Sequence, residues 1–262
     1  MVEGCTLQES FAIQWRVTKA LVMREILDRY GRHNIGFMWM FFEPMLFTLA
    51  VTALWTVAGM GHGSDFPIVA FAITGYSPVL LWRNMPSRCE KAVQANHTLM
   101  HHRNVKLMDI YASRLLLEGG GATISFFLLT IFFGSLGWVS MPYNLLEVAF
   151  GWIMMAWFGC SLAILVGASA ERLEFIGILW HPTSYILFPL SGAAFSVDTL
   201  PPAFQTAVLY VPMVHAVECI REGFLGPLYT AHYDLSYLAC WNLALSILGC
   251  AQMRYVSRKI IA

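Results

Sequence analysis

The chain has 262 residues, of which 58% are hydrophobic and only 12% are charged, and its formal net charge at pH 7 is zero. A soluble globular protein carries about 25% charged residues, so this composition excludes an ordinary soluble domain and indicates an integral membrane protein. The balanced charge also argues against a nucleic-acid partner.

The first predicted element is a helix over residues 7–29 at the membrane surface. Its apolar residues recur at spacings of four and seven while charged residues occupy other faces, which is typical of an amphipathic interface helix. A helix packed on the protein's own cytoplasmic side fits the same pattern. We assign residues 1–34 to this cytoplasmic segment and residues 35–262 to a transmembrane domain. The first ten residues lack an apolar core, so we expect no cleavable signal peptide.

Six apolar stretches are candidates for membrane-spanning helices, each of which needs about 20 apolar residues. The fifth contains Pro182 and Pro189, so we expect it to be kinked or broken. With these spans, 15 of the 16 Lys and Arg residues lie on one side of the membrane and only Arg221 on the other, which places both termini in the cytoplasm. The predicted spans are residues 35–58, 66–82, 119–139, 145–170, 175–197 and 235–253.

A buried polar feature, Glu43 followed by Pro44, interrupts the first span. A carboxylate at that depth costs about 2.5–3.5 kcal/mol on insertion scales, so it should face protein or water rather than lipid. This favours a transport protein over a simple anchor.

The segment between the fifth and sixth spans, residues 198–234, is apolar but too short to cross the membrane twice. Its helix-like stretches, residues 203–211 and 214–224, are separated by Pro212. This favours a re-entrant hairpin that dips into the outer leaflet, because backbone breaks at membrane depth are tolerated where protein or water covers them. A helical pair lying flat on the outer surface is the alternative.

The second of these stretches carries four polar residues at helical spacings. They form either a structural ion cluster or a gate or docking surface, since charges beside an apolar hairpin are costly to bury. The four are His215, Glu218, Arg221 and Glu222.

The chain lacks the chemistry of an ATP-binding subunit. None of its four lysines follows a glycine, so no Gly-x-x-x-x-Gly-Lys-Ser/Thr phosphate loop exists. We therefore expect no catalytic residue and no directly bound cofactor; ATP, if it drives this protein, binds to another polypeptide. His97, His101 and His102 form a possible metal face, but no carboxylate or thiol completes it, and we predict no metal site.

Three stretches of sequence carry a resemblance to a known family. They run from Arg29-Tyr30-Gly31-Arg32 through Gly36 to Glu43-Pro44; from Thr74-Gly75-Tyr76 through Trp82-Arg83 and Ala95-Asn96 to Arg114-Leu115; and from Ser191-Gly192 through Leu200-Pro201 and Pro212 to His215, Glu218 and Arg221-Glu222. In this order they resemble the ABC-2 type permeases that export bacterial capsular polysaccharide, which are relatives of O-antigen exporters. The stretch from Tyr76-Ser77-Pro78 to Trp82 departs from the family, which more often has a longer aromatic and proline pattern there.

The resemblance implies an all-α integral membrane protein of the ABC-2, or type V exporter, fold. That fold has an amino-terminal interface helix, six transmembrane helices and a re-entrant pair before the last. It implies a homodimer in the bacterial inner membrane, paired with two copies of an ABC ATPase subunit that binds ATP and Mg. Periplasmic co-polymerase-like and outer-membrane proteins continue the export path, and the substrate is a lipid-linked, usually acidic polysaccharide.

The resemblance also implies coupling helices after spans two and four, here residues 87–100 and 169–175. We expect aromatic rings to stack on sugars and guanidinium groups to pair with acidic groups in the inner conduit, although the general cytoplasmic bias of basic residues explains Arg83 and Arg88 equally well. The conduit residues are Trp39, Tyr76, Trp82, Arg83 and Arg88, and the residues coupling to the ATPase are Glu90, Asn96, His97, Leu99, Glu171 and Arg172.

Other functions fit the chain less well. The permease of an O-antigen or teichoic-acid type polysaccharide exporter is the alternative within the same family. An ion-coupled carrier would need an ionisable relay in several spans, and apart from Glu43 the spans are nearly bare. A membrane glycosyltransferase would usually need paired carboxylates on a cytoplasmic loop, where Glu90 and Asp109 are isolated.

Overall fold

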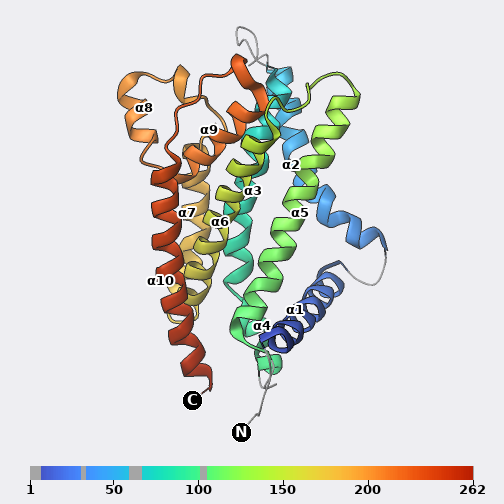
Figure 1. Ribbon diagram of the computed structural model, residues 1–262, viewed down its shortest axis with the longest axis vertical. Coiled ribbons are helices and arrows are strands. Elements are labelled where there is room, and N and C mark those ends of the chain that lie inside the picture. The colour runs from blue at the N-terminus through green and yellow to red at the C-terminus, as the bar shows by residue number, and fades with distance from the viewer. Residues whose placement is uncertain (1–6, 31–33, 59–66, 101–104, 262) are drawn as a thin grey trace.

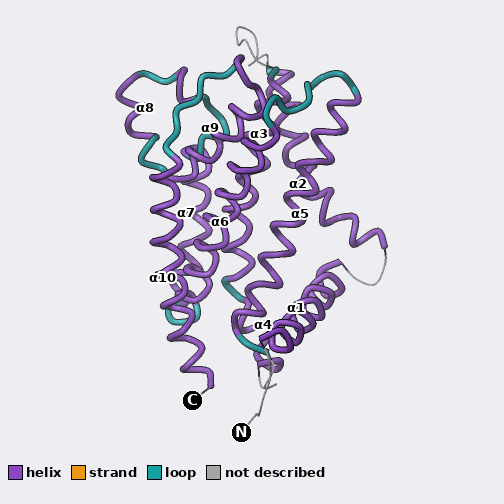
Figure 2. The backbone as a smooth tube through the Cα atoms, viewed as in Figure 1, coloured by secondary structure: helices purple, strands orange, loops and turns teal. Residues whose placement is uncertain are grey.

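The computed structural model describes residues 7–30, 34–58, 67–100 and 105–261, and every regular element in these ranges is a helix (Figure 1). This confirms the predicted all-α class. The loops gather at the two ends of the bundle (Figure 2). The α-helices are α1 (Leu7–Tyr30), α2 (Asn34–Val57), α3 (Ile68–Cys89), α4 (Ala92–Met100), α5 (Leu107–Ser135), α6 (Leu145–Ala170), α7 (Glu174–Leu190), α8 (Pro202–Val208), α9 (Pro212–Leu225) and α10 (Leu235–Ile261), with short 3-10 turns η1 (Val197–Thr199) and η2 (Gly226–Leu228).

The helix α6 is the centre of the bundle and packs against α3, α7, α9 and α10. Two glycines on it let its neighbours approach closely, as small residues do in membrane bundles. A Cβ atom at Gly151 would lie 2.8 Å from Ile220 of α9, and one at Gly159 would lie 3.0 Å from the Leu81 carbonyl of α3. The helix α1 and the carboxyl end of α10 lie at one end of the bundle, and α8 and α9 lie at the other (Figure 1).

Three described helices are long and apolar enough to cross a membrane: α5, α6 and the part of α10 from Leu235 to Lys259. The pair formed by α8 and residues 212–228 passes the same test together but is bent by 107°. A broken helical pair therefore lies where the sequence predicted a hairpin.

The helix α2 agrees closely with the first predicted span, and α6 coincides with the fourth. Figure 1 shows α2 changing direction along its length.

The ends of other helices differ from the predicted spans. These helices continue through charged residues, because side chains from neighbouring elements pair with the charges. The helix α3 continues past Trp82 to Cys89, and α5 begins at Leu107, twelve residues before the predicted start. The carboxylate of Asp109 accepts a hydrogen bond from the Lys106 backbone N–H at 2.8 Å and so caps α5. The last helix, α10, also extends beyond residue 253.

The fifth predicted span and both predicted coupling helices are corrected by the structure. The helix α7 is continuous across Pro182 but ends at Leu190, directly after Pro189, so it is shorter than residues 175–197. The range 87–100 is divided between the end of α3 and α4, which is kinked at Asn96. The range 169–175 is a turn rather than a helix, because only three residues separate α6 from α7.

The surface helix α1 does not bury a single apolar stripe. Trp15, Val22 and Ile26 line a groove against α5, although Trp15 is 59% exposed. Phe11 does not line this groove and is 73% exposed. Apolar side chains therefore occur on both the packed and the open sides of α1.

Candidate functional site

A network of charged side chains joins α1, α3 and α5. Glu118 of α5 pairs with Arg29 of α1 and with Arg88 of α3, the latter at 3.1 Å between Nε and Oε1. Glu25 pairs with Arg29 at 2.8 Å and with Arg114 at 3.4 Å. Burial opposes the charge of Arg29, but attraction and hydrogen bonds from Glu118 and Glu25 outweigh it and hold the pKa of Arg29 above its usual value. The network fixes α1 to the bundle.

The junction between α3 and α4 is tied to α7 and α1. Glu90 Oε2 lies 3.0 Å from Nε2 of His181 in α7. A Cβ atom at Gly177 would lie 2.6 Å from Glu90 Oε1, so the glycine makes room for this carboxylate. The side-chain oxygen of Asn96, at the kink in α4, accepts a hydrogen bond from Arg24 of α1 at 2.9 Å. Two of the predicted coupling residues thus contact other helices.

The turn between α6 and α7 contacts α4 and α10. Glu171 lies near the backbone of Gln94 in α4; burial raises the pKa of Glu171, and this neighbouring backbone group partly offsets the rise. Arg172 donates to the Gln252 side-chain oxygen at 2.6 Å and lies 4.3 Å from the ring centroid of Tyr255. The two predicted coupling segments therefore touch each other. The side chains of His97 and Leu99 lie outside the described part of the chain.

Aromatic rings from three helices meet beside Arg83. Its guanidinium carbon lies 4.5 Å from the ring centroid of Tyr185 and 5.5 Å from that of Phe188, both in α7. The ring of Tyr76 lies 5.7 Å from Phe188, and Phe47 of α2 lies 6.1 Å from the same ring. These edge-to-face and tilted rings, together with a guanidinium group, form a surface suited to sugars and acidic groups.

The five predicted conduit residues have different environments. Trp82 is fully buried and Tyr76 is 5% exposed, so both belong to the core of this chain in the conformation described. Arg88 pairs with Glu118, whereas Arg83 is partly exposed. The side chain of Trp39 lies outside the described residues, as do those of the first-span pair Glu43 and Pro44.

Two buried charges in α9 hold the opposite end of the bundle together. Arg221 and Glu218 have fully buried side chains, with 3.8 Å between Nη1 and Oε1. Arg221 donates to the backbone carbonyls of Ala193 and Phe195 at 2.7 Å each, and its guanidinium carbon lies 3.7 Å from the ring centroid of Phe71 in α3. One side chain thus joins α9, α3 and the segment after α7.

Glu218 accepts the remaining hydrogen bonds of this buried pair. The Tyr229 hydroxyl donates to it at 2.5 Å, and the backbone N–H groups of His232 and Val197 donate at 3.1 and 3.5 Å. Glu222 lies instead beside Glu147 of α6. The predicted cluster is therefore a buried ion pair with separate neighbours rather than one exposed group.

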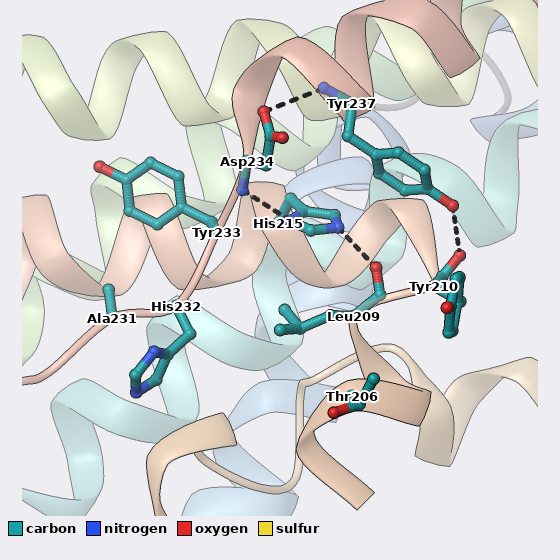
Figure 3. A pocket seen from close by; sticks show the side chains of 9 residues that line it. All are labelled: Thr206, Leu209, Tyr210, His215, Ala231, His232, Tyr233, Asp234 and Tyr237. Carbon is teal, nitrogen blue, oxygen red and sulfur yellow. Dashed lines mark hydrogen bonds between the residues drawn. The ribbon is translucent and has the colours of Figure 1, made fainter. Parts of the chain in front are cut away.

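A pocket of about 580 Å³ lies beside His215, between the end of α8 and the start of α10 (Figure 3). Nε2 of His215 lies 2.8 Å from the Leu209 carbonyl, and Nδ1 lies 2.9 Å from the Asp234 backbone N–H. These bonds require the neutral tautomer with its hydrogen on Nε2, and they join the α8–α9 turn to the segment before α10. The pocket is lined by Thr206, Leu209, Tyr210, His215, Ala231, His232, Tyr233, Asp234 and Tyr237.

Within the described ranges, no group of three or more His, Cys, Asp or Glu side chains has the arrangement of a metal site. The histidines 101 and 102 lie outside those ranges.

The sequence analysis did not identify Glu118 and Glu25, which pair with arginines, or Tyr229, which donates a hydrogen bond to Glu218. Glu118 directly precedes three glycines at the start of an apolar run, and a charge at such a place was a detectable signal. Tyr229 and Glu25 gave no such signal, because their partners are distant in sequence.

Comparison with known families identifies the family of this chain. The sequence profile described as ABC-2 type transporter matches residues 16–225. The chain belongs to the ABC-2 type transporter family. The match runs from residue 16, within α1, to the end of α9 and so includes the charged network, the ring cluster and the buried ion pair.

Similar ABC-2 proteins align with almost the whole chain. It is 38% identical over 252 residues to the capsule polysaccharide export inner-membrane protein CtrC of Neisseria meningitidis serogroup B, covering 96% of this chain and 95% of that protein. It is 36% identical over 255 residues to the capsule polysaccharide export inner-membrane protein BexB of Haemophilus influenzae, covering 97% and 96%. The polysialic acid transport protein KpsM of Escherichia coli is 26% identical over 255 residues, covering 94% and 96%.

Proposed function

We propose that this chain is the membrane-spanning subunit of an ATP-driven ABC transporter that exports capsular polysaccharide across the bacterial inner membrane. The observation that carries the proposal is the nearly full-length similarity to two capsule export inner-membrane proteins. Its substrate is a lipid-linked and acidic polymer. A long polymer requires many weak contacts rather than one tight site, because it must leave as well as enter.

The proposed subunit has six spans, α2, α3, α5, α6, α7 and α10, with both termini in the cytoplasm. Figure 1 supports this topology, because α1 and the carboxyl end of α10 lie at the same end of the bundle. The pair α8 and α9 forms the re-entrant hairpin at the outer side; its sharp bend and the buried ion pair of α9 are consistent with backbone breaks covered by protein.

The proposed complex holds two copies of this chain and two copies of a separate ABC ATPase, which binds ATP and Mg. Periplasmic co-polymerase-like and outer-membrane proteins continue the path. The α3–α4 junction and the turn at Glu171 receive the motion of the ATPase, and their contact supports a shared role. From there, the bonds of Glu90 to α7 and of Asn96 to α1 carry it to other helices. Arg83, with the rings of α7, contributes to the inner conduit.

The decisive experiment restores a capsule-deficient bacterial strain with this chain and its partner ATPase, separately and together. We expect surface polymer only when both are present, and no ATP hydrolysis by the rigorously purified single chain. Restoration of an O-antigen defect but not of a capsule defect would instead assign the polymer to the O-antigen class.

The coupling role is tested with Ala95→Pro. The backbone N–H of Ala95 donates to the Lys91 carbonyl at 3.2 Å, and proline removes this bond at a cost of about 3 kcal/mol in helix stability. We expect the variant to insert in the membrane but to lose ATPase binding or export, while Ala95→Gly keeps most of both. Unchanged binding and export in Ala95→Pro would exclude α4 as a coupling element.

A further inference from the structure

An apolar groove of about 310 Å³ lies between α1 and α5. On α5 it runs along residues 116–124, a length of about 12 Å at the rise of an α-helix. Its walls include Val22 and Ile26 of α1 and the exposed side chains of Leu116 and Ile124 of α5. The length and the apolar walls suit part of one extended hydrocarbon chain.

The floor of the groove is kept open by Gly120. Packing explains why the neighbouring position, 119, is a glycine: a Cβ atom there would lie 3.2 Å from the Met85 methyl group. A Cβ atom at Gly120 would meet no atom within 4 Å, so no protein neighbour requires a glycine there. Glycine inside a helix is less stable than alanine. The helix therefore keeps an empty space at a position where a large side chain would occupy the groove.

Two polar residues of α1, Lys19 and Thr18, are among the residues that line this largely apolar groove. Lys19 is exposed and forms no ion pair with any residue that the structure describes. Thr18 is 9% exposed, and its hydroxyl has no hydrogen-bond partner among those residues. An ammonium group and a free hydroxyl beside an apolar channel are complementary to a phosphate with an attached acyl chain.

We propose that the α1–α5 groove binds one anionic phospholipid of the bilayer, with an acyl chain along Gly120 and its phosphate at Lys19 and Thr18. The bound lipid fills the space between the surface helix and α5 and so belongs to the packed structure. Its assignment to the cytoplasmic leaflet rests on the proposed orientation of the chain; the binding itself does not.

The test measures lipid binding to the full-length protein in detergent by native mass spectrometry. The probes are phosphatidylglycerol and phosphatidylcholine with identical acyl chains, so that only the head group differs. We expect the unmodified protein to retain phosphatidylglycerol preferentially. We expect Lys19→Gln to weaken phosphatidylglycerol binding about fivefold, the equivalent of one basic residue at an anionic surface, and to leave phosphatidylcholine unchanged. Lys19→Arg should retain the preference.

The groove itself is tested with Gly120→Leu, whose side chain occupies the acyl position. It should lose both lipids, while Gly120→Ala keeps phosphatidylglycerol. If the Gly120→Leu variant does not fold, the Lys19 variants alone test the lipid site. Equal binding of both lipids by the unmodified protein, no effect of Lys19→Gln, or unchanged binding in a folded Gly120→Leu would each overturn the proposal. Preferential retention of a lipid-linked saccharide would overturn it too. This experiment measures lipid binding and does not measure export. A negative result would therefore overturn the lipid site and leave the proposed transport function untouched.

Discussion

Gly75 of α3 shows how one missing side chain permits the buried contacts of Arg221. A Cβ atom at Gly75 would lie 2.4 Å from the Ala193 carbonyl and 2.6 Å from Arg221 Nη2. We predict that Gly75→Ala destabilises the protein, because loss of a buried hydrogen bond costs about 1–3 kcal/mol and exceeds the gain of about 1 kcal/mol in helix propensity. Thermal unfolding in detergent measures the change. The matched control is Gly120→Ala, which adds the same methyl group in open space and should raise the unfolding temperature. A more stable Gly75→Ala would show that the Arg221 contacts are dispensable.

The ion pair of Glu218 and Arg221 gives a second prediction at this scale. Removing one partner leaves the other charge buried, so Glu218→Ala should cost on the order of 3–5 kcal/mol. Replacing both, in Glu218→Leu with Arg221→Met, should recover much of that loss, because the desolvation cost of both charges disappears. A double-mutant cycle on the unfolding temperature provides the measurement. Additive losses in the double variant would contradict coupling between these two side chains.

At the scale of elements, the position of α1 depends on Glu118. Its carboxylate pairs with Arg29 and Arg88, and hydrogen bonds to charged groups contribute about 1.5–3 kcal/mol each. We predict that Glu118→Gln increases amide hydrogen exchange throughout α1 but not in α6. The control is Asp28→Asn, because the pair of Asp28 with Arg24 is exposed and should contribute less than about 1 kcal/mol. Similar exchange in Glu118→Gln and the unmodified chain would show that apolar packing alone holds α1.

At the scale of the whole molecule, the two ends of the bundle should face opposite sides of the membrane. We predict that Thr230→Cys, after η2, reacts with a membrane-impermeant maleimide in intact spheroplasts. Lys91→Cys, between α3 and α4, should react only after permeabilisation. Both residues are exposed, so both thiols are accessible to reagent. The native cysteines, of which Cys240 and Cys250 are exposed, are first replaced by alanine. The opposite labelling pattern would invert the proposed topology.

The sequence by itself determined the helical class, the membrane location and the boundaries of α2 and α6. A long apolar run in a membrane can adopt few conformations other than a helix, because every backbone polar group must form its hydrogen bond within the protein. It also indicated the broken pair α8 and α9, since Pro212 marks the break directly. The four polar residues of α9 were visible as a set, but their partners were not.

The tertiary structure decided where the charged residues lie and how far helices extend through them. The helices α3 and α5 continue through Arg88 and Arg114 because acidic side chains from other helices neutralise them. Hydropathy cannot foresee this, since the partners are distant in sequence. For the same reason, only the packed structure brought Arg221 to the carbonyls after α7 and Glu171 to α4. Local sequence sets the helices of this protein, while the free energy of burying charges, which depends on three-dimensional neighbours, sets their ends and contacts.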